Sequence, residues 1–182
     1  MPCGPILPAA TLHLMLSTSL VIRKGTKEDS SAITALVNRA YAGEGGGWTN
    51  ETGLVEGPRS SLDMVLEFME RGTFLVGQEG GAGPLVASVF VEDQGAGAIY
   101  IGLLSVEPAM QDRAFGLALM RSCDAFAREQ GLSRVTLTVL SGRETLQSWY
   151  ERRGFRSTGE RTPLPHGQGL ELLRYEKVLE TA

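Results

Sequence analysis

The segment from Ala98 to Met120 restricts the fold of this chain more than any other part of it. An apolar strand runs to Val106, Pro108 follows, and a short loop with one glycine, Gly116, leads at once into an apolar helix. A strand that leads directly into a helix leaves the backbone N–H groups of the first helical turn unpaired. Those donors and the positive end of the helix dipole favour an anion such as phosphate. The segment therefore predicts an anion site between a strand and a helix.

The remaining segments alternate between strand and helix periodicity. Apolar residues spaced along one helical face predict helices, and short apolar or alternating runs bounded by turns predict strands. We expect helices at about 30–41, 61–70, 116–130 and 143–153, and strands at about 20–23, 73–78, 85–92, 98–106, 135–139, 155–158 and 170–178. Three consecutive strands at hairpin-like spacing favour antiparallel pairing. The strand–helix–strand unit after them predicts a mixed sheet with helices on both faces, an α/β (α+β) fold.

At 182 residues the chain has the length of one domain. We expect residues 19–182 to form that domain and residues 1–18, which are apolar and interrupted by prolines, to be a loose N-terminal extension. Met15 is an alternative start of the natural protein. The extension lacks a basic segment typical of signal peptides, and it is too short and broken to cross a membrane. We therefore expect no membrane association.

Charge and cysteine content exclude some functions. The net charge of −4 argues against nucleic-acid binding, which needs clustered Lys and Arg, and it fits a cationic substrate such as an amine. The two cysteines, Cys3 and Cys123, lie far apart in the sequence and match no metal or disulfide pattern. Their isolation is typical of a protein of the reducing cytoplasm.

A second motif, Tyr150-x-x-x-Gly154-Phe155, ends a predicted helix after a further strand. Together with the loop after Pro108, it resembles the GNAT superfamily of N-acetyltransferases, as a bacterial subgroup of unknown acceptor. The resemblance extends over about residues 20–179. It implies a GNAT-like, mostly antiparallel sheet of six to seven strands and acetyl-CoA as co-substrate, with no metal.

The acyl-CoA signature of this family, Gln/Arg-x-x-Gly-x-Gly/Ala, aligns with the chain in two registers. Counting from the family's Val-x-Pro places Gln111 first, with Ala114 and Gly116 at the two glycine positions. An alanine Cβ at the first glycine position would crowd the backbone where it approaches the pyrophosphate. A register that starts at Arg113 and ends at Ala118 fits the pattern but not the spacing from the proline.

We prefer the first register, because Leu119-Met120 then falls at the family's Leu-Leu pair. In either register the resemblance implies that the loop and first helical turn hold the cofactor: Gln111, Asp112, Arg113, Ala114, Phe115, Gly116, Leu117 and Ala118. Arg113 is placed either to meet a CoA phosphate or to remain solvated beside Asp112. Arg143 stands where many relatives have asparagine, so we expect no contact from it to the cofactor.

The resemblance also implies that the fourth strand separates from the fifth near Leu104, Ser105 and Val106. Backbone groups left free there would pair with the pantetheine arm as an added strand would. A backbone N–H in this gap would stabilise the negative charge that develops on the thioester oxygen.

In the family the tyrosine of the second motif lies beside the cofactor sulfur. A phenol with a pKa near 10 can donate its proton to a departing thiolate with a pKa near 8.5. Tyr150 is therefore the expected general acid, and a purely structural buried tyrosine is the alternative.

Acyl transfer also requires a group that removes a proton from the attacking ammonium. The main candidates for this base are Glu51 and Glu107, and Glu56, Glu92 and His166 are further ones. Each has the simpler alternative of a solvated surface residue.

A polar loop that follows Gly43–Gly47 carries Trp48, Glu51 and Arg59. Loops in this position commonly shape the acceptor pocket in the family. The glycines would let the loop move as a lid, or it is a flexible connector.

These observations predict an N-acetyltransferase that moves an acetyl group from acetyl-CoA to a primary amine of a small molecule or peptide. No Ser-His-Asp or Cys-His arrangement is evident, so we expect direct attack in a ternary complex. The alternative is an acyl-CoA-binding sensor with the same fold and no turnover. Homodimers are common in the superfamily, and no sequence feature decides for or against one here.

Overall fold

The computed structural model of the chain describes residues 20–42, 51, 54, 57–164 and 169–180. These residues build a seven-stranded sheet in the order β1-β2-β3-β4-β5-β7-β6. Neighbouring strands are antiparallel except β4 and β5, which are parallel. The predicted mixed, mostly antiparallel α/β fold is therefore confirmed. The segment 1–18, predicted as a loose extension, lies outside the described residues.

The element bounds follow the predicted ones closely. The strands are β1 (Leu20–Lys24), β2 (Thr73–Glu79), β3 (Leu85–Asp93), β4 (Ala98–Val106), β5 (Arg134–Leu140), β6 (Arg156–Pro163) and β7 (Glu171–Val178). The α-helices are α1 (Ser30–Tyr41), α2 (Leu62–Arg71), α3 (Phe115–Glu129) and α4 (Glu144–Glu151), with 3-10 turns η2 (Lys27–Asp29) and η3 (Pro108–Arg113).

Strand β6 is the element that the sequence pattern defined least well. The prediction ended it at Thr158, whereas the strand continues to Pro163. All of its residues are exposed, because β6 lies at the sheet edge, so it has no apolar alternation that would reveal its length. Gly154, at the end of the preceding helix, has a φ of 88°, which confirms its predicted left-handed cap.

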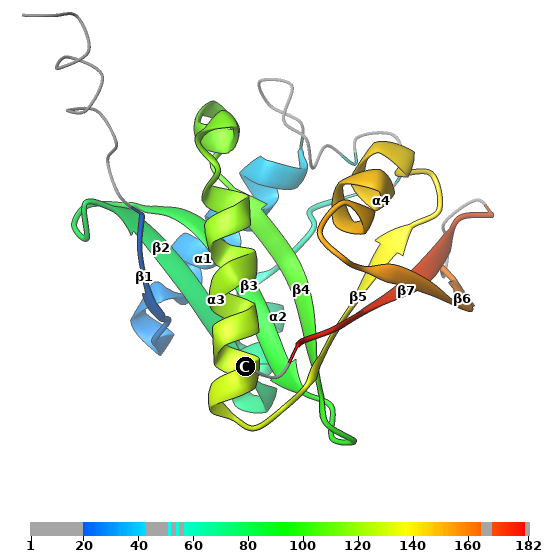
Figure 1. Cartoon of the computed structure of the whole chain (residues 1–182). Coiled ribbons are helices and arrows are strands. Elements are labelled where there is room, and N and C mark those ends of the chain that lie inside the picture. Colours follow the sequence, from blue (N-terminus) through cyan, green and yellow to red (C-terminus); the bar gives the residue numbers. More distant parts are fainter. Residues whose placement is uncertain (1–19, 43–50, 52–53, 55–56, 165–168, 181–182) are drawn as a thin grey trace, which may run out of the picture.

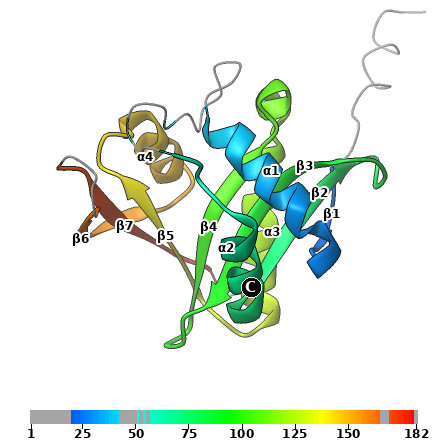
Figure 2. The same cartoon turned by 180° about the vertical axis from the view of Figure 1, so that it is seen from behind.

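Helices cover both faces of the sheet, as predicted. Helix α3 lies across one face, and α1 and α2 lie on the other (Figures 1 and 2). The core on the α3 face includes Leu119 and Cys123 of α3 and extends to Tyr150 of α4 and Tyr175 of β7. The core under α1 and α2 is built from α1, α2 and strands β2 to β4. Cys123 is a buried free thiol, consistent with a packing role.

The two central strands separate along most of their length. Strands β4 and β5 pair only from Ala98 and Arg134 to Tyr100 and Thr136, although both continue for several residues. We call the region beyond this pairing the β4–β5 opening. Just after the strands part, the β3–β4 register shifts by one residue, and Leu103 takes a φ of 50°. This β-bulge bends β4 away from β5 and confirms the separation that the family resemblance implied.

We predict that Gly72→Ala lowers the free energy of unfolding by about 2 to 3 kcal/mol, because overpacking next to backbone is hard to relieve. A Cβ at Gly72 would lie 2.3 Å from the Val91 carbonyl oxygen and 2.9 Å from the Phe90 ring. Urea unfolding measures the change. Gly142→Ala is the control, because its Cβ would meet only the Leu170 side chain at 3.4 Å and a more distant one. Equal stability of the two variants would contradict the packing described here.

Candidate functional site

The edge of β4 that faces the opening presents backbone groups to it. The N–H of Glu107 donates to the carbonyl of Val86 on β3 at 2.8 Å. Since the hydrogen-bonding direction alternates along a strand, the backbone groups of Leu104 and Val106 point away from β3 and into the opening. The Gln111 amide nitrogen donates to the Val106 carbonyl at 3.2 Å, so a side chain from η3 already occupies one of these carbonyls.

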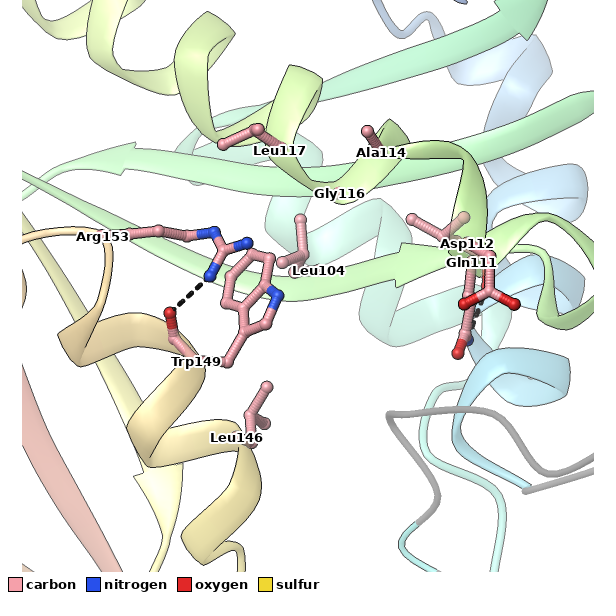
Figure 3. Close-up of a pocket in the computed structure, with 10 residues that line it drawn as sticks. Leu104, Gln111, Asp112, Ala114, Gly116, Leu117, Leu146, Trp149 and Arg153 are labelled. Carbon is pink, nitrogen blue, oxygen red and sulfur yellow. Dashed lines mark hydrogen bonds between the residues drawn. The ribbon is translucent and has the colours of Figure 1, made fainter.

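A cavity of about 260 Å³ lies on the α3 side of this edge. Figure 3 shows its wall, with Gln111 and Asp112 at one end and Arg153 at the other. The wall comprises Leu104, Val106, Gln111, Asp112, Ala114, Gly116, Leu117, Leu146, Trp149 and Arg153. We call it the α3 cavity. Most of the cofactor residues predicted from the sequence therefore lie around one space.

The N-terminus of α3 forms the centre of this wall. Ala114 precedes the helix with a φ of 59° and a ψ of 17°, a left-handed conformation that alanine rarely adopts. The first intrahelical bond joins the Ala118 N–H to the Ala114 carbonyl at 3.0 Å, so the earlier N–H groups of the turn have no helical acceptor. A Cβ at Gly116 would point toward the Trp149 ring, 3.8 Å away. The missing side chain of Gly116 keeps the space between α3 and α4 open.

The turn after α4 supplies an arginine, Arg153, that the sequence analysis did not single out. The Arg153 guanidinium stacks on the Trp149 ring, 3.5 Å from its centroid, and donates to the Trp149 carbonyl at 2.7 Å (Figure 3). Its Nε is buried and makes no hydrogen bond within the described residues. Burial lowers the pKa of Arg153, but the group remains cationic. The four-residue spacing of Trp149 and Arg153 on one helical face was the signal that would have identified this pair.

Four of the predicted cofactor residues lie outside the wall of the α3 cavity. Arg113 pairs with Glu79 at 2.6 Å, and its guanidinium faces the Phe115 ring. Phe115 itself is buried in the core, and Ser105 is fully buried within β4. Ala118 is the fourth residue of α3, and its N–H already donates to the Ala114 carbonyl. The structure thus brings Gln111 rather than Arg113 to the cavity.

A second, smaller cavity of about 50 Å³ lies in the β4–β5 opening. We call it the opening cavity. Its polar wall consists of Tyr41, Glu51, Arg59, Tyr100, Thr138 and Tyr150. Leu104 of β4 and Leu146 of α4 line both this cavity and the α3 cavity. The two spaces therefore adjoin across these two leucines.

Glu51 is the only carboxylate among the described residues that line the opening cavity. Its side chain is 9% exposed, and its carboxylate oxygens lie 3.2 Å from Arg59 Nε and 3.6 Å from Arg143 Nη1. Burial raises the pKa of Glu51, and the two arginines act in the opposite direction. Arg143 thus contacts the predicted base.

Tyr150 lies one helical turn after Leu146 on α4, beside the junction of the cavities. Its ring packs edge-on against Trp149 and Phe155, with centroid distances of 5.0 Å and 5.6 Å. Burial raises the pKa of the Tyr150 hydroxyl above its ordinary value, so the group stays protonated and remains a donor.

The other predicted bases lie apart from both cavities or outside the described residues. The Glu107 carboxylate accepts hydrogen bonds from the Arg39 guanidinium, the shortest at 2.9 Å. Glu92 lies opposite Tyr100 in the β3–β4 register, away from the end of β4 that leads to α3. Trp48, Glu56 and His166, and the glycines of the predicted lid, lie outside the described residues.

Among the residues that the structure describes, no helix is long and apolar enough to cross a membrane. Nor do three or more His, Cys, Asp or Glu side chains gather there in a way that would hold a metal ion.

Comparisons with known proteins place this geometry in context. The family model described as acetyltransferase (GNAT) family matches residues 36–155. A comparison with curated proteins gave no match. Among solved structures, the ribosomal-protein-S18-alanine N-acetyltransferase of Escherichia coli is similar with a TM-score of 0.70 and 17% identity, covering 90% of this chain and 96% of that one.

Two other solved structures show the same fold. Ard1 of Thermoplasma volcanium has a TM-score of 0.71 and 18% identity, over 89% of this chain and 99% of that one. An acetyltransferase of the GNAT family from Staphylococcus aureus Mu50 has a TM-score of 0.69 and 14% identity, over 89% of this chain and 100% of that one. At these identities the structures support the fold, and the family model covers most of the chain, including both motifs. The chain belongs to the acetyltransferase (GNAT) family.

Proposed function

We propose that this protein transfers the acetyl group of acetyl-CoA to a primary amine of a small molecule or peptide, by direct attack in a ternary complex. The observation that carries the proposal is the junction of the two cavities at Leu104 and Leu146. One cavity ends in a helix N-terminus suited to phosphate, and the other contains a buried carboxylate suited to an ammonium. A donor and an acceptor that entered from opposite sides would meet at this junction.

The α3 cavity fits a CoA thioester. Acetyl-CoA would supply an acyl group activated by a thiolate leaving group. The N–H groups of Phe115, Gly116 and Leu117 and the dipole of α3 would hold the pyrophosphate. Arg153 adds a cation at the α4 side of the same cavity, where it would pair with a phosphate oxygen.

The structure supports the register that starts at Gln111. Ala114 occupies the left-handed position before α3, which is the conformation for which glycine is favoured. Gln111 lines the α3 cavity, whereas Arg113 pairs with Glu79. In this register Ala114 replaces the first glycine of the signature, and Gly116 is the second.

The free edge of β4 would bind the pantetheine arm and activate the thioester. The Leu104 and Val106 carbonyls already accept hydrogen bonds from the Tyr41 and Gln111 side chains. The edge therefore offers mainly N–H donors to a ligand. The Leu104 N–H, at the junction of the cavities, would donate to the thioester oxygen and stabilise the charge that develops there.

We propose Glu51 as the base and Tyr150 as the acid. Glu51 lines the opening cavity, and its raised pKa brings it closer to the working range of a base. Glu107 remains the second candidate, although Arg39 holds its carboxylate. The Tyr150 hydroxyl would donate its proton to the departing sulfur.

Incubation with acetyl-CoA and a panel of primary amines, with detection of free thiol, tests the proposed function. We expect amine-dependent thiol release by the native protein. Gly116→Val should abolish acetyl-CoA binding, because the added methyl groups fill the space between α3 and Trp149. Ala125→Val, at an exposed position of the same helix, should bind normally. Tight binding of acetyl-CoA without amine-dependent release would instead identify an acyl-CoA sensor.

Removal of the Tyr150 hydroxyl tests the acid. We predict that Tyr150→Phe lowers kcat by about 100-fold, as expected for loss of general acid catalysis. The dissociation constant of CoA should stay nearly constant, because Tyr150 lines the opening cavity rather than the α3 cavity. Steady-state kinetics and calorimetry measure the two effects. An unchanged kcat in an assay limited by chemistry would exclude Tyr150 as the acid.

The pH profile tests the base. A raised pKa keeps Glu51 protonated to a higher pH than a free glutamate, and a protonated carboxyl cannot accept a proton. Activity should therefore fall as the pH drops through a midpoint above the ordinary glutamate value of about 4.3. Glu51→Gln should lower kcat/KM by about 100-fold and remove this acidic limb. If Glu107→Gln rather than Glu51→Gln had this effect, the assignment would be reversed.

A further inference from the structure

The bulge in β4 places an unusual backbone conformation at the junction of the cavities. Leu103 is not glycine, yet its φ is 50°, in the left-handed region. Such conformations are unfavourable and persist only where neighbouring groups hold them. Leu104 follows directly and lines both cavities. The direction of the Leu104 N–H therefore depends on how the peptide planes around the bulge are held.

Two hydroxyl groups hold these planes. The Ser105 hydroxyl donates to the Leu103 carbonyl at 3.0 Å, which fixes the peptide that carries the Leu104 N–H. The Tyr41 hydroxyl donates to the Leu104 carbonyl at 3.3 Å, which fixes the following peptide. Both peptide planes that flank the Leu104 Cα are thus anchored by a side-chain donor. A donor on the carbonyl of a peptide also polarises its N–H, which strengthens that N–H as a donor.

Several contacts fix the position of Tyr41, which belongs to α1 on the face of the sheet opposite α3 (Figures 1 and 2). It is the last residue of α1, and its carbonyl accepts the N–H of Glu51 at 3.0 Å. The Arg59 guanidinium faces its ring, 5.2 Å from the centroid. Burial raises the pKa of the Tyr41 hydroxyl, so this group remains a donor across the pH range of the enzyme.

We propose that Tyr41 and Ser105 are positioning residues that together fix the Leu103–Leu104–Ser105 backbone, so that the Leu104 N–H points at the thioester oxygen of acetyl-CoA. This inference rests on the proposed function, because it requires acetyl-CoA at the junction. Neither hydroxyl touches the reacting atoms in this scheme. Tyr41 also joins the backbone of the proposed base to the strand that activates the thioester.

The infrared band of the thioester carbonyl tests the inference without an acceptor amine. Acetyl-CoA, isotope-labelled at this carbonyl, is added to the native protein, and a hydrogen bond to the oxygen shifts the band to lower frequency. We expect Tyr41→Phe and Ser105→Ala each to lose most of this shift. Their dissociation constants for acetyl-CoA should remain within about threefold of the native value, since the phosphate and pantetheine contacts persist.

Matched variants distinguish positioning from packing. Tyr175→Phe also removes the hydroxyl of a buried tyrosine, which donates to Gln147 at 3.3 Å, and it should leave the band unchanged. Ser88→Ala is the control for Ser105→Ala, because Ser88 is buried opposite it on β3 and its hydroxyl makes no hydrogen bond among the described residues. Circular dichroism verifies that all four variants fold.

The outcomes separate this inference from the proposed function. A shifted band that both Tyr41→Phe and Ser105→Ala weaken, while the controls keep it, supports the inference. A shifted band that neither variant changes more than its control overturns the inference and leaves acetyl transfer intact. Absence of acetyl-CoA binding to the native protein would overturn the proposed function, and the inference with it.

Discussion

The early separation of β4 from β5 is the constraint on which the rest of the site depends. In a continuous sheet the backbone groups of Leu104 and Val106 would pair with β5, and no donor would be available to a ligand. Pairing stops after Tyr100 and Thr136, and the bulge at Leu103 turns β4 away. The result is a strand edge inside the sheet rather than at its rim. This edge is protected from aggregation because helices and side chains flank it.

The two cavities beside this edge differ in the charged groups that line them. The α3 cavity presents backbone N–H groups and one guanidinium, which suit the phosphates of a large anionic donor. The opening cavity instead holds the Glu51 carboxylate between Arg59 and Arg143. Burial raises the pKa of Glu51, and the two arginines favour its charged form. A carboxylate enclosed in this way is shielded from bulk water. Local periodicity cannot reveal this environment, because Glu51 and Arg143 are far apart in the chain.

The sequence was sufficient to predict the secondary structure and the loop that leads into α3, because both depend on local patterns. Apolar periodicity defined α1 and α3, and the strand–proline–helix order located the α3 cavity. The sequence did not predict the length of β6, whose exposed residues carry no pattern. Nor did it predict the hydrogen bond of Tyr41 to Leu104, because the two residues are 63 positions apart. Arg153 could be predicted only in part: its spacing from Trp149 is evident in the sequence, but its position on the wall of the α3 cavity is not.

The two cores differ in how far they reach across the sheet. The core on the α3 face joins both halves, and the Lys177–Asp124 ion pair at 2.6 Å adds a further link between β7 and α3. The core beneath α1 and α2 includes only residues that precede β5. The halves therefore share one apolar core on the α3 face, whereas polar contacts such as that of Arg143 with Glu51 join them away from it. Local opening requires less free energy where fewer apolar contacts must break. The α1–α2 face of this domain can therefore open between the halves at a lower cost in free energy than the α3 face.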